Sequence, residues 1–430
     1  MTELKERLHA AGVHTLLVQF TDVFGVAKGK LVPLAHLDDV LNTGAGFAGP
    51  SIWGTGLPRT GPRSEYYARG DASTAMPLPW MPGVARIVGD GFVAGEAFDA
   101  CPRQVLKRAL VRLAGHGLSL RTGIEPEFFL LKRDGATWLP ADEHDRLDKP
   151  SYDLKSLPRQ GGFLHELSAA LGACGLDVLQ IDHEDAHGQY ELNFAFGDAL
   201  VSADRLMLFK LAAHALAEAR GMVFSMMPKP FANQPGSGLH FHVSLWRGEQ
   251  PADGVARAFI AGVLAHAPAL TALAAPTVNS YKRLTVGESL SGTTWAPAYV
   301  AHGPNNRTAL VRTLPGRFEW RLPDASANPY LATAALVAAG LDGIERGLDP
   351  GPACIEDLFA LSLAQIHERG IPLLPQSLGE AVGALEADGV ITAALGPTLA
   401  SEFLRLKRAE FTAYSRHVSA WELERYAALF

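Results

Sequence analysis

The segment from Gly123 to Leu131 constrains the fold of this chain most, because two glutamates two positions apart lead directly into an apolar run. Side chains alternate between the two faces of a β-strand, so Glu125 and Glu127 point to the same side. Two ionised carboxylates beside apolar side chains repel each other and are costly to remove from water unless a cation lies between them. The segment therefore predicts either a metal-binding strand or an edge strand whose glutamates face water.

Length and charge limit the classes of protein and partner that fit this chain. Its 430 residues exceed the usual size of one domain, and 48% hydrophobic with 19% charged residues is typical of globular proteins with a large core. The formal charge of -7 includes no block rich in lysine and arginine, which argues against nucleic acid or a membrane surface as a partner. Small molecules are the expected partners.

The cysteines and the N-terminus predict a soluble, cytoplasmic protein. Cys101, Cys174 and Cys354 lie far apart and form no paired motif, as expected of reduced thiols in a core. The first residues contain no apolar signal segment, and the longest apolar helix candidate, Tyr330 to Leu341, is too short to span a bilayer.

Hydrophobic periodicity predicts a small mixed unit, residues 1–99, followed by a larger unit, residues 100–430. The small unit is expected to contain one helix, three strands and a long irregular loop, over residues 3–11, 14–22, 29–32, 84–89 and 44–80, respectively. Helices of the larger unit are expected over residues 102–115, 162–172, 203–220, 257–274 and 328–341. Its strands are expected over residues 123–131, 178–196 as a hairpin, 223–227, 239–246, 307–312 and 317–322.

Acidic and basic side chains recur on several of these strands, where alternation places them on one face. Besides Glu125 and Glu127, the strands carry Glu184 and Glu191 of the hairpin, His240 and His242, and Arg317, Glu319 and Arg321. A set of metal ligands made mostly of carboxylate oxygens, with one or two imidazoles, suits Mg²⁺ or Mn²⁺ better than zinc. An alternating strand with its polar face in water has the same pattern, so one strand alone does not decide between the two.

Arginines near these strands indicate a phosphate substrate, because guanidinium groups hold phosphate and carboxylate oxygens in fixed positions. The candidates are Arg283, Arg307, Arg312, Arg317 and Arg321. Ion pairs with surface acids would explain each arginine singly just as well. Since the chain lacks a P-loop, a dinucleotide fingerprint and a serine-nucleophile motif, metals and arginines would have to hold a nucleotide. Gly236 to Gly238 could bring backbone amides close to a substrate, or form only a turn.

Taken together, these segments resemble the motifs of the glutamine synthetase family, in the family's order. The resemblance extends over nearly the whole chain, since two N-terminal segments also match. The segments that carry it are Phe20–Asp22, Phe47–Ile52, Gly123–Leu130, Asp182–Glu191, Gly236–Leu245, Asn279–Arg283, Asn306–Arg307, Arg317–Asp324 and Asn328–Leu331.

The resemblance implies an α+β fold with a small N-terminal β-grasp domain and a larger catalytic domain built on a curved antiparallel sheet. It also implies a homo-oligomer of stacked rings, typically of twelve subunits, in which each neighbour's N-terminal domain completes an active site. The expected small molecules are L-glutamate, an amine and ATP as a substrate. About two or three Mg²⁺ or Mn²⁺ ions per site are expected as cofactors.

The resemblance also assigns roles to individual residues. One metal would be held by Glu127, Glu184 and Glu191, and a second by Glu125, His240 and Glu319. The ATP contacts would be His242, Ser244, Arg312 and Arg317. Glutamate and the transferred phosphoryl group would be bound by Gly236, Arg283, Arg307 and Arg321. The residues expected to act in catalysis are Glu184, Arg307 and Arg312.

Departures from the family pattern concern the amine. Glutamine synthetases have an aspartate after the Phe of the segment aligned with Phe47 to Ile52, whereas Ala48 stands there in this chain. Trp295 occupies the position of a second carboxylate over the ammonium pocket, and Pro235 that of a substrate-binding asparagine. An aromatic wall favours an alkylammonium over bare ammonium through cation–π attraction and methyl burial. Ala48 and Trp295 are therefore counted among the substrate-binding positions.

These features resemble the short branch of the family that contains type III-like glutamine synthetases and γ-glutamylmethylamide synthetases. The resemblance implies an ATP-dependent carbon–nitrogen ligase that makes a γ-glutamyl amide through γ-glutamyl phosphate, with methylamine favoured as the amine. Ammonia is the alternative, and other amines remain open. A non-catalytic member with a structural or sensing role is disfavoured, because all the ligand positions are filled.

Overall fold

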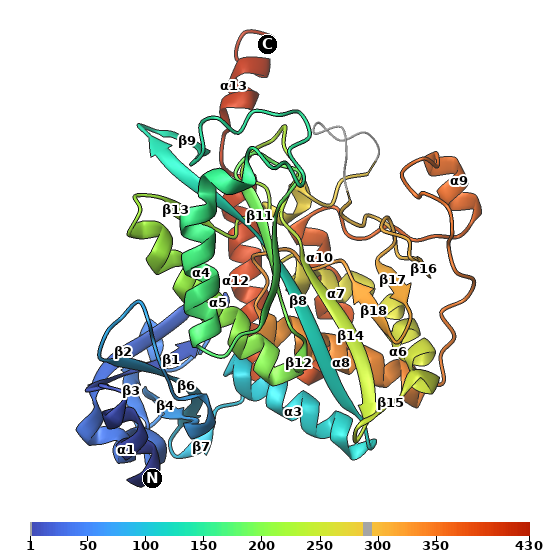
Figure 1. The fold of residues 1–430 in the computed structure, drawn as a ribbon. Helices are drawn as coiled ribbons and strands as arrows, with labels where there is room; N and C mark the ends of the chain where they lie inside the picture. Colours follow the sequence, from blue (N-terminus) through green and yellow to red (C-terminus); the bar gives the residue numbers. More distant parts are fainter. Residues whose placement is uncertain (1, 287–294) are drawn as a thin grey trace.

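The computed structural model describes residues 2–286 and 295–430, in which helices surround two β-sheets (Figure 1). The chain enters through the smaller sheet, drawn in blue, and then builds the larger sheet and most of the helices. The fold is therefore α+β, as the sequence predicts.

The smaller sheet has the central strand order β2-β1-β6-β4-β3, with β5 and β7 paired to β6. β1 runs antiparallel to β2 and parallel to β6. The helices of this unit are α1 (Thr2–Ala10) and α2 (Leu37–Asn42). The strands are β1 (Thr15–Thr21), β2 (Ala27–Pro33), β3 (Ala45–Ala48), β4 (Glu65–Gly70), β5 (Met76–Pro77), β6 (Val84–Val93) and β7 (Glu96–Ala97).

The expectation of an irregular loop over residues 44–80 is wrong, because β3, β4 and β5 lie within it. These strands are short and bracketed by glycine and proline, which hides their alternation. Tyr66 and Ala68 of β4 are buried, and the Tyr66 ring packs against Phe20 of β1 at a centroid distance of 4.9 Å. Burial against β1 and β6 thus stabilises strands that local sequence does not reveal.

The two sheets share one hydrophobic core, and a buried arginine joins them. Arg103, at the start of α3 (Pro102–Gly115), forms ion pairs with Asp71 at 2.9 Å, Asp90 at 2.8 Å and Asp204 at 2.9 Å. Asp71 and Asp90 belong to the N-terminal unit and Asp204 to a helix of the larger one. The boundary between residues 99 and 100 remains a prediction, since the core is continuous across it.

The larger sheet has the order β10-β11-β8-β14-β18-β17-β16, with β9, β12 and β13 paired to β8 and β15 to β14. Figure 1 shows β8 and β14 running side by side through the middle of the larger unit. The strands are β8 (Ser119–Asp134), β9 (Thr137–Pro140), β10 (Val178–His183), β11 (Gln189–Phe194), β12 (Gly197–Asp198), β13 (Val223–Ser225), β14 (Leu239–Arg247), β15 (Gln250–Pro251), β16 (His302–Pro304), β17 (Val311–Leu314) and β18 (Arg317–Trp320). The predicted hairpin is confirmed, because β10 and β11 pair antiparallel.

Helices pack against this sheet, and α8 (Pro329–Glu345) lies deepest in the core. Its start is fixed by Asn328, whose side chain accepts hydrogen bonds from the backbone amides of Tyr330 and Leu331. The other helices are α4 (Gly161–Ala173), α5 (Ala199–Glu218), α6 (Asp253–Ala265), α7 (Ala267–Ala274), α9 (Leu363–Glu368), α10 (Leu378–Ala387), α11 (Gly389–Leu395), α12 (Pro397–Ser415) and α13 (Ala420–Tyr426).

Two further expectations are wrong. Residues 257–274 form two helices, α6 and α7, that meet at an angle of 77°. Pro268 in the first turn of α7 lacks the N–H that a continuous helix would need. Residues 307–310 form a turn before β17, because Asn306 accepts hydrogen bonds from both the amide and the hydroxyl of Thr308.

Within the described part of the chain, no single helix is long and apolar enough to cross a bilayer. α6 and α7 are long and apolar enough only when they are taken together, and the chain bends by 77° between them.

Candidate active site

One cavity of about 570 Å³ collects most of the residues predicted to act together. Its walls come from β8, the β10–β11 hairpin, β14, β17 and β18. The predicted residues that line it are Glu125, Glu127, Glu184, Glu191, His240, His242, Trp295, Arg307, Arg312, Arg317, Glu319 and Arg321. The glutamates of β8 thus face a cavity and not bulk water.

Strand register explains why these side chains meet. His240 of β14 lies opposite Glu125 of β8, and His242 lies opposite Glu319 of β18. On the other side of β8, Glu127 lies opposite Glu191 of β11. Because side chains alternate along each strand, polar groups two residues apart on neighbouring strands project into the same cavity.

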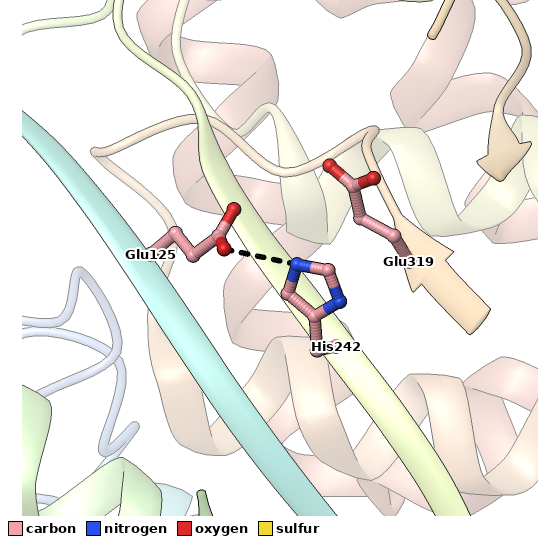
Figure 2. A group of neighbouring side chains, drawn as sticks. All are labelled: Glu125, His242 and Glu319. Atoms are coloured by element: carbon pink, nitrogen blue, oxygen red, sulfur yellow. Dashed lines mark ion pairs between the residues drawn. The ribbon is translucent and has the colours of Figure 1, made fainter. Parts of the chain in front are cut away.

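The first group of possible metal ligands is centred on Glu125 (Figure 2). The Glu125 carboxylate lies 2.9 Å from Nε2 of His242, and Figure 2 shows Glu319 joining this group from β18. Nδ1 of His240 is 3.7 Å from both Glu125 and Glu319. Burial raises the pKa of Glu125, but hydrogen bonds with His240 and His242 outweigh it and hold this pKa well below its usual range. Glu125 is therefore ionised and could bind a cation.

The second group combines Asp182, Glu184 and Glu191, whose oxygens lie within 4.8 Å of one another. Burial and the charges of Glu127 and Glu125 raise the pKa of Asp182 to about 6. Burial and neighbouring carboxylates likewise raise the pKa of Glu184 and of Glu191 well above the usual range. Crowded acids of this kind are stabilised by a cation between them.

The structure brings the expected ligands together, in groups that overlap. His240 lies near Glu125 and Glu319, as the resemblance implies, and also near Glu191. His242, expected to contact ATP, lies with Glu125 and Glu319 as well. Asp182 joins Glu184 and Glu191, and sequence reasoning missed it. The available signal was its position two residues before Glu184, the same spacing as in the pair on β8.

Glu127 lines the same cavity but already has partners in the protein. Its Oε2 accepts hydrogen bonds from the Gly238 amide at 2.7 Å and from the Gln189 side chain at 3.0 Å. A Cβ on residue 238 would lie 2.8 Å from Glu127 Oε1 and 2.6 Å from His240 Nε2, so any residue larger than glycine would displace these two site side chains. The glycine-rich turn therefore brings a backbone amide to a site carboxylate.

Arginines surround the acidic groups. Arg312 donates to Oε2 of Glu319 at 2.9 Å, Arg321 hydrogen-bonds the other oxygen of Glu319, and Arg317 donates to Nδ1 of His242 at 3.0 Å. Arg307 is exposed at the cavity and forms no ion pair with any described residue. Cationic groups thus adjoin possible metal ligands, an arrangement suited to a phosphate chain bridging both.

A smaller cavity of about 360 Å³ adjoins the first and shares Glu125, Asn193, His242 and Arg317 with it. Ser244 lies here together with apolar and aromatic side chains that sequence reasoning did not single out. These additional residues are Leu179, Phe194, Phe196 and Trp246. Flat apolar walls next to cationic groups suit a nucleotide whose base lies in the smaller cavity and whose phosphates reach the first one.

Three predicted substrate residues do not line either cavity. Arg283 is buried and donates to the backbone carbonyls of Leu322 at 3.1 Å and Arg321 at 3.3 Å. Gly236 packs close to the Arg283 side chain. Ala48 is exposed on β3 of the smaller sheet. The structure therefore places Arg283 and Gly236 beneath the site and leaves Ala48 away from it.

Comparisons with known proteins agree with this site. Residues 99–426 match the family model described as glutamine synthetase, catalytic domain. The glutamate–methylamine ligase of Methyloversatilis universalis is 49% identical, covering 100% of this chain and 99% of the relative. The glutamine synthetase of Rhizobium leguminosarum bv. phaseoli is 39% identical over 94% of each chain. A solved structure described as a GmaS/ADP complex superposes with a TM-score of 0.92 at 40% identity, covering 99% of this chain and 100% of that one. The chain belongs to the glutamine synthetase family.

Proposed function

We propose that this protein is an ATP-dependent ligase that joins L-glutamate to methylamine and forms γ-glutamylmethylamide. The observation that carries the proposal is the convergence of carboxylates, histidines and arginines in one cavity next to a second cavity suited to a base. The full-length similarity to a glutamate–methylamine ligase supports methylamine as the amine. So does Trp295, whose side chain lies in the cavity and is 47% exposed.

The donor set fits divalent metal ions, which the ligases of this family use together with ATP. Carboxylate oxygens with one or two imidazoles suit Mg²⁺ or Mn²⁺, and the raised pKa of Glu191 and its neighbours shows excess negative charge. The residues that would hold the ions are Glu125, Asp182, Glu184, Glu191, His240, His242 and Glu319, with Glu127 beside them. A bound ion would neutralise charge on the phosphates.

The chain's own residues then position the reactants. Arg312 and Arg317 face the place where the phosphate chain leaves the smaller cavity, and Arg307 is free to approach the transferred phosphoryl group. An oxygen of the glutamate γ-carboxylate attacks the γ-phosphorus and ADP leaves. The amine nitrogen then attacks the acyl carbon, the bond to phosphate breaks, and a carboxylate such as Glu184 accepts the surplus proton.

The proposed enzyme is a homo-oligomer of stacked rings and acts in the cytoplasm. The position of Ala48 supports the oligomer, because this residue is exposed at the end of β3 and does not line the cavity of its own chain. It can meet an amine only if another copy of the chain presents it. Rings that bring the smaller sheet of one subunit against the cavity of the next would do so.

Ammonia is the second candidate for the amine, supported by glutamine synthetases at 37–40% identity among the relatives. A phosphate-release assay with an amine panel decides between them. We expect release to require L-glutamate, Mg²⁺ and an amine, with a higher kcat/KM for methylamine than for ammonia at equal free-base concentration. A higher value for ammonia would make the protein a glutamine synthetase, and no release with any amine would contradict the ligase function.

A further inference from the structure

The amine side of the cavity contains an acidic residue with no assigned role. Asp185 follows Glu184 in the turn between β10 and β11 and lines the cavity together with Ser151 and Trp295. Its Oδ2 accepts a hydrogen bond from the indole N–H of Trp295 at 3.0 Å, and its Oδ1 accepts one from the Ser151 hydroxyl. One carboxylate thus connects the turn that carries Glu184 to the aromatic wall of the cavity.

Trp295 is held at two points. Besides the indole bond to Asp185, its backbone carbonyl accepts a hydrogen bond from Arg321 at 3.4 Å. Arg321 is also bonded to Glu319, one of the possible metal ligands. The indole therefore has a fixed place between the phosphate side of the cavity and Asp185, although almost half of its surface is exposed.

The Asp185 carboxylate has no cationic partner among residues 2–286 and 295–430. The two side chains that donate hydrogen bonds to it, Ser151 and Trp295, are both neutral. Asp185 therefore offers an uncompensated negative charge at the cavity wall to a cationic substrate group. An alkylammonium is such a group.

A second aromatic ring lies on the same side of the cavity. Tyr152 is 68% exposed and lines the cavity next to Ser151. Its backbone has φ +61°, an uncommon conformation for a bulky residue, and its amide donates to the carbonyl of His183 at 3.0 Å. A strained conformation persists only where the surrounding structure holds it, and residues of this kind cluster at ligand sites.

We propose that Asp185 is a positioning residue that sets the amine specificity of the site. It fixes the Trp295 indole and contributes the negative charge that faces the ammonium, so that the methyl group lies on the aromatic ring while the nitrogen stays near Glu184. This inference rests on the proposed function. It also explains how the site keeps an anionic partner for the amine where Ala48 and Trp295 replace two carboxylates of the family pattern.

The test compares Asp185→Asn, Trp295→Phe and the double variant with the unaltered protein. Asparagine lacks the charge and one acceptor oxygen, and phenylalanine keeps an aromatic face but lacks the N–H. We expect each single variant to lower the ratio of kcat/KM for methylamine to that for ammonia, Asp185→Asn by about tenfold or more. The KM for ATP should change little, because the smaller cavity is untouched.

The double variant shows whether Asp185 acts by positioning Trp295 or whether the two residues affect selectivity independently. If Asp185 acts through Trp295, the double variant loses less selectivity than the product of the two single losses. Asp148→Asn, an exposed aspartate on the loop before Ser151, is the matched control and should leave the selectivity ratio unchanged. The melting temperature of every variant shows whether the fold is retained.

An unchanged selectivity ratio in a folded Asp185→Asn variant would overturn the inference. So would equal losses for methylamine and ammonia together with a raised KM for ATP, which would indicate a structural role of the turn. If the unaltered protein does not use methylamine, the proposed function itself fails, so the two failures are distinguishable.

Discussion

At the scale of single residues, the site concentrates negative charge that the protein alone does not neutralise. Asp182, Glu184 and Glu191 lie together on the β10–β11 hairpin, beside the strand that carries Glu125 and Glu127. Their pKa values are raised by burial and mutual repulsion, whereas the pKa of Glu125 is lowered by its histidine partners. The folded chain therefore binds protons at this cluster more readily than the unfolded chain does.

This charge predicts a pH-dependent effect of metal on stability. Carboxylates whose pKa is raised in the folded state destabilise the metal-free fold at neutral pH, where they must ionise. This loss of folding free energy becomes smaller as the pH drops through about 6, the pKa of Asp182, because the carboxylates then bind protons. Metal replaces these protons, so Mg²⁺ or Mn²⁺ should raise the melting temperature more at about pH 7.5 than at about pH 5.5. At a hundredfold excess over Kd the stabilisation is about 2.7 kcal/mol.

Melting curves with metal and with EDTA at both pH values measure the effect. Asp182→Asn removes one titrating group and should reduce the difference between the two pH values. A metal-induced shift that is equal at both pH values would contradict the assignment of the cluster as a metal site.

At the scale of elements, His266 connects the junction of two helices to two further helices. It lies between α6 and α7, and its ring nitrogens are 2.6 Å from Asp388 and 3.0 Å from Asp342. Asp342 belongs to α8, and Asp388 caps the first turn of α11 by accepting from the amides of Val390 and Ile391. This contact fixes the bend that replaces the single helix expected from the sequence.

His266→Ala should therefore destabilise the fold without changing the active-site residues. The two half-buried carboxylates would lose a shared hydrogen-bond partner, at a cost of about 1–3 kcal/mol, while Asp342 keeps its ion pair with Arg346. Thermal unfolding measures the loss, with His165→Ala at an exposed position of α4 as the matched control. A melting temperature of the His266 variant equal to that of the control would contradict this role.

Sequence patterns predicted the elements that carry strong periodicity or a clear cap. The alternation in β8 and β14, the β10–β11 hairpin and the Asn328 cap of α8 were visible because each depends on residues close in sequence. The strands β3 and β4 were not predicted, because tertiary packing stabilises them. The bend between α6 and α7 was not predicted either, because it depends on the single residue Pro268. Tyr152 and Asp185 were missed because turn geometry brings them to the cavity. Asp182 lies on β10 and was missed although its spacing from Glu184 was visible in the sequence.

At the scale of the whole molecule, the larger sheet gathers distant segments into one site. β8, β11, β14 and β18 contribute side chains separated by up to almost two hundred positions, and their register alone brings them into one cavity. The family motifs identified these segments, but only the paired strands show which histidine lies beside which glutamate. The smaller sheet carries Ala48 outside the cavity, so the complete amine site is proposed to include a second subunit.

The proposed function requires side chains from these strands to hold divalent ions beside a nucleotide. An anomalous difference map from crystals of the protein grown with Mn²⁺ and ADP would locate these ions. We expect manganese peaks inside the cavity, within coordination distance of Glu125, Glu191 and Glu319, with the base in the smaller cavity. Manganese bound only elsewhere on the protein, with the cavity carboxylates free of metal while the nucleotide is bound, would contradict this requirement.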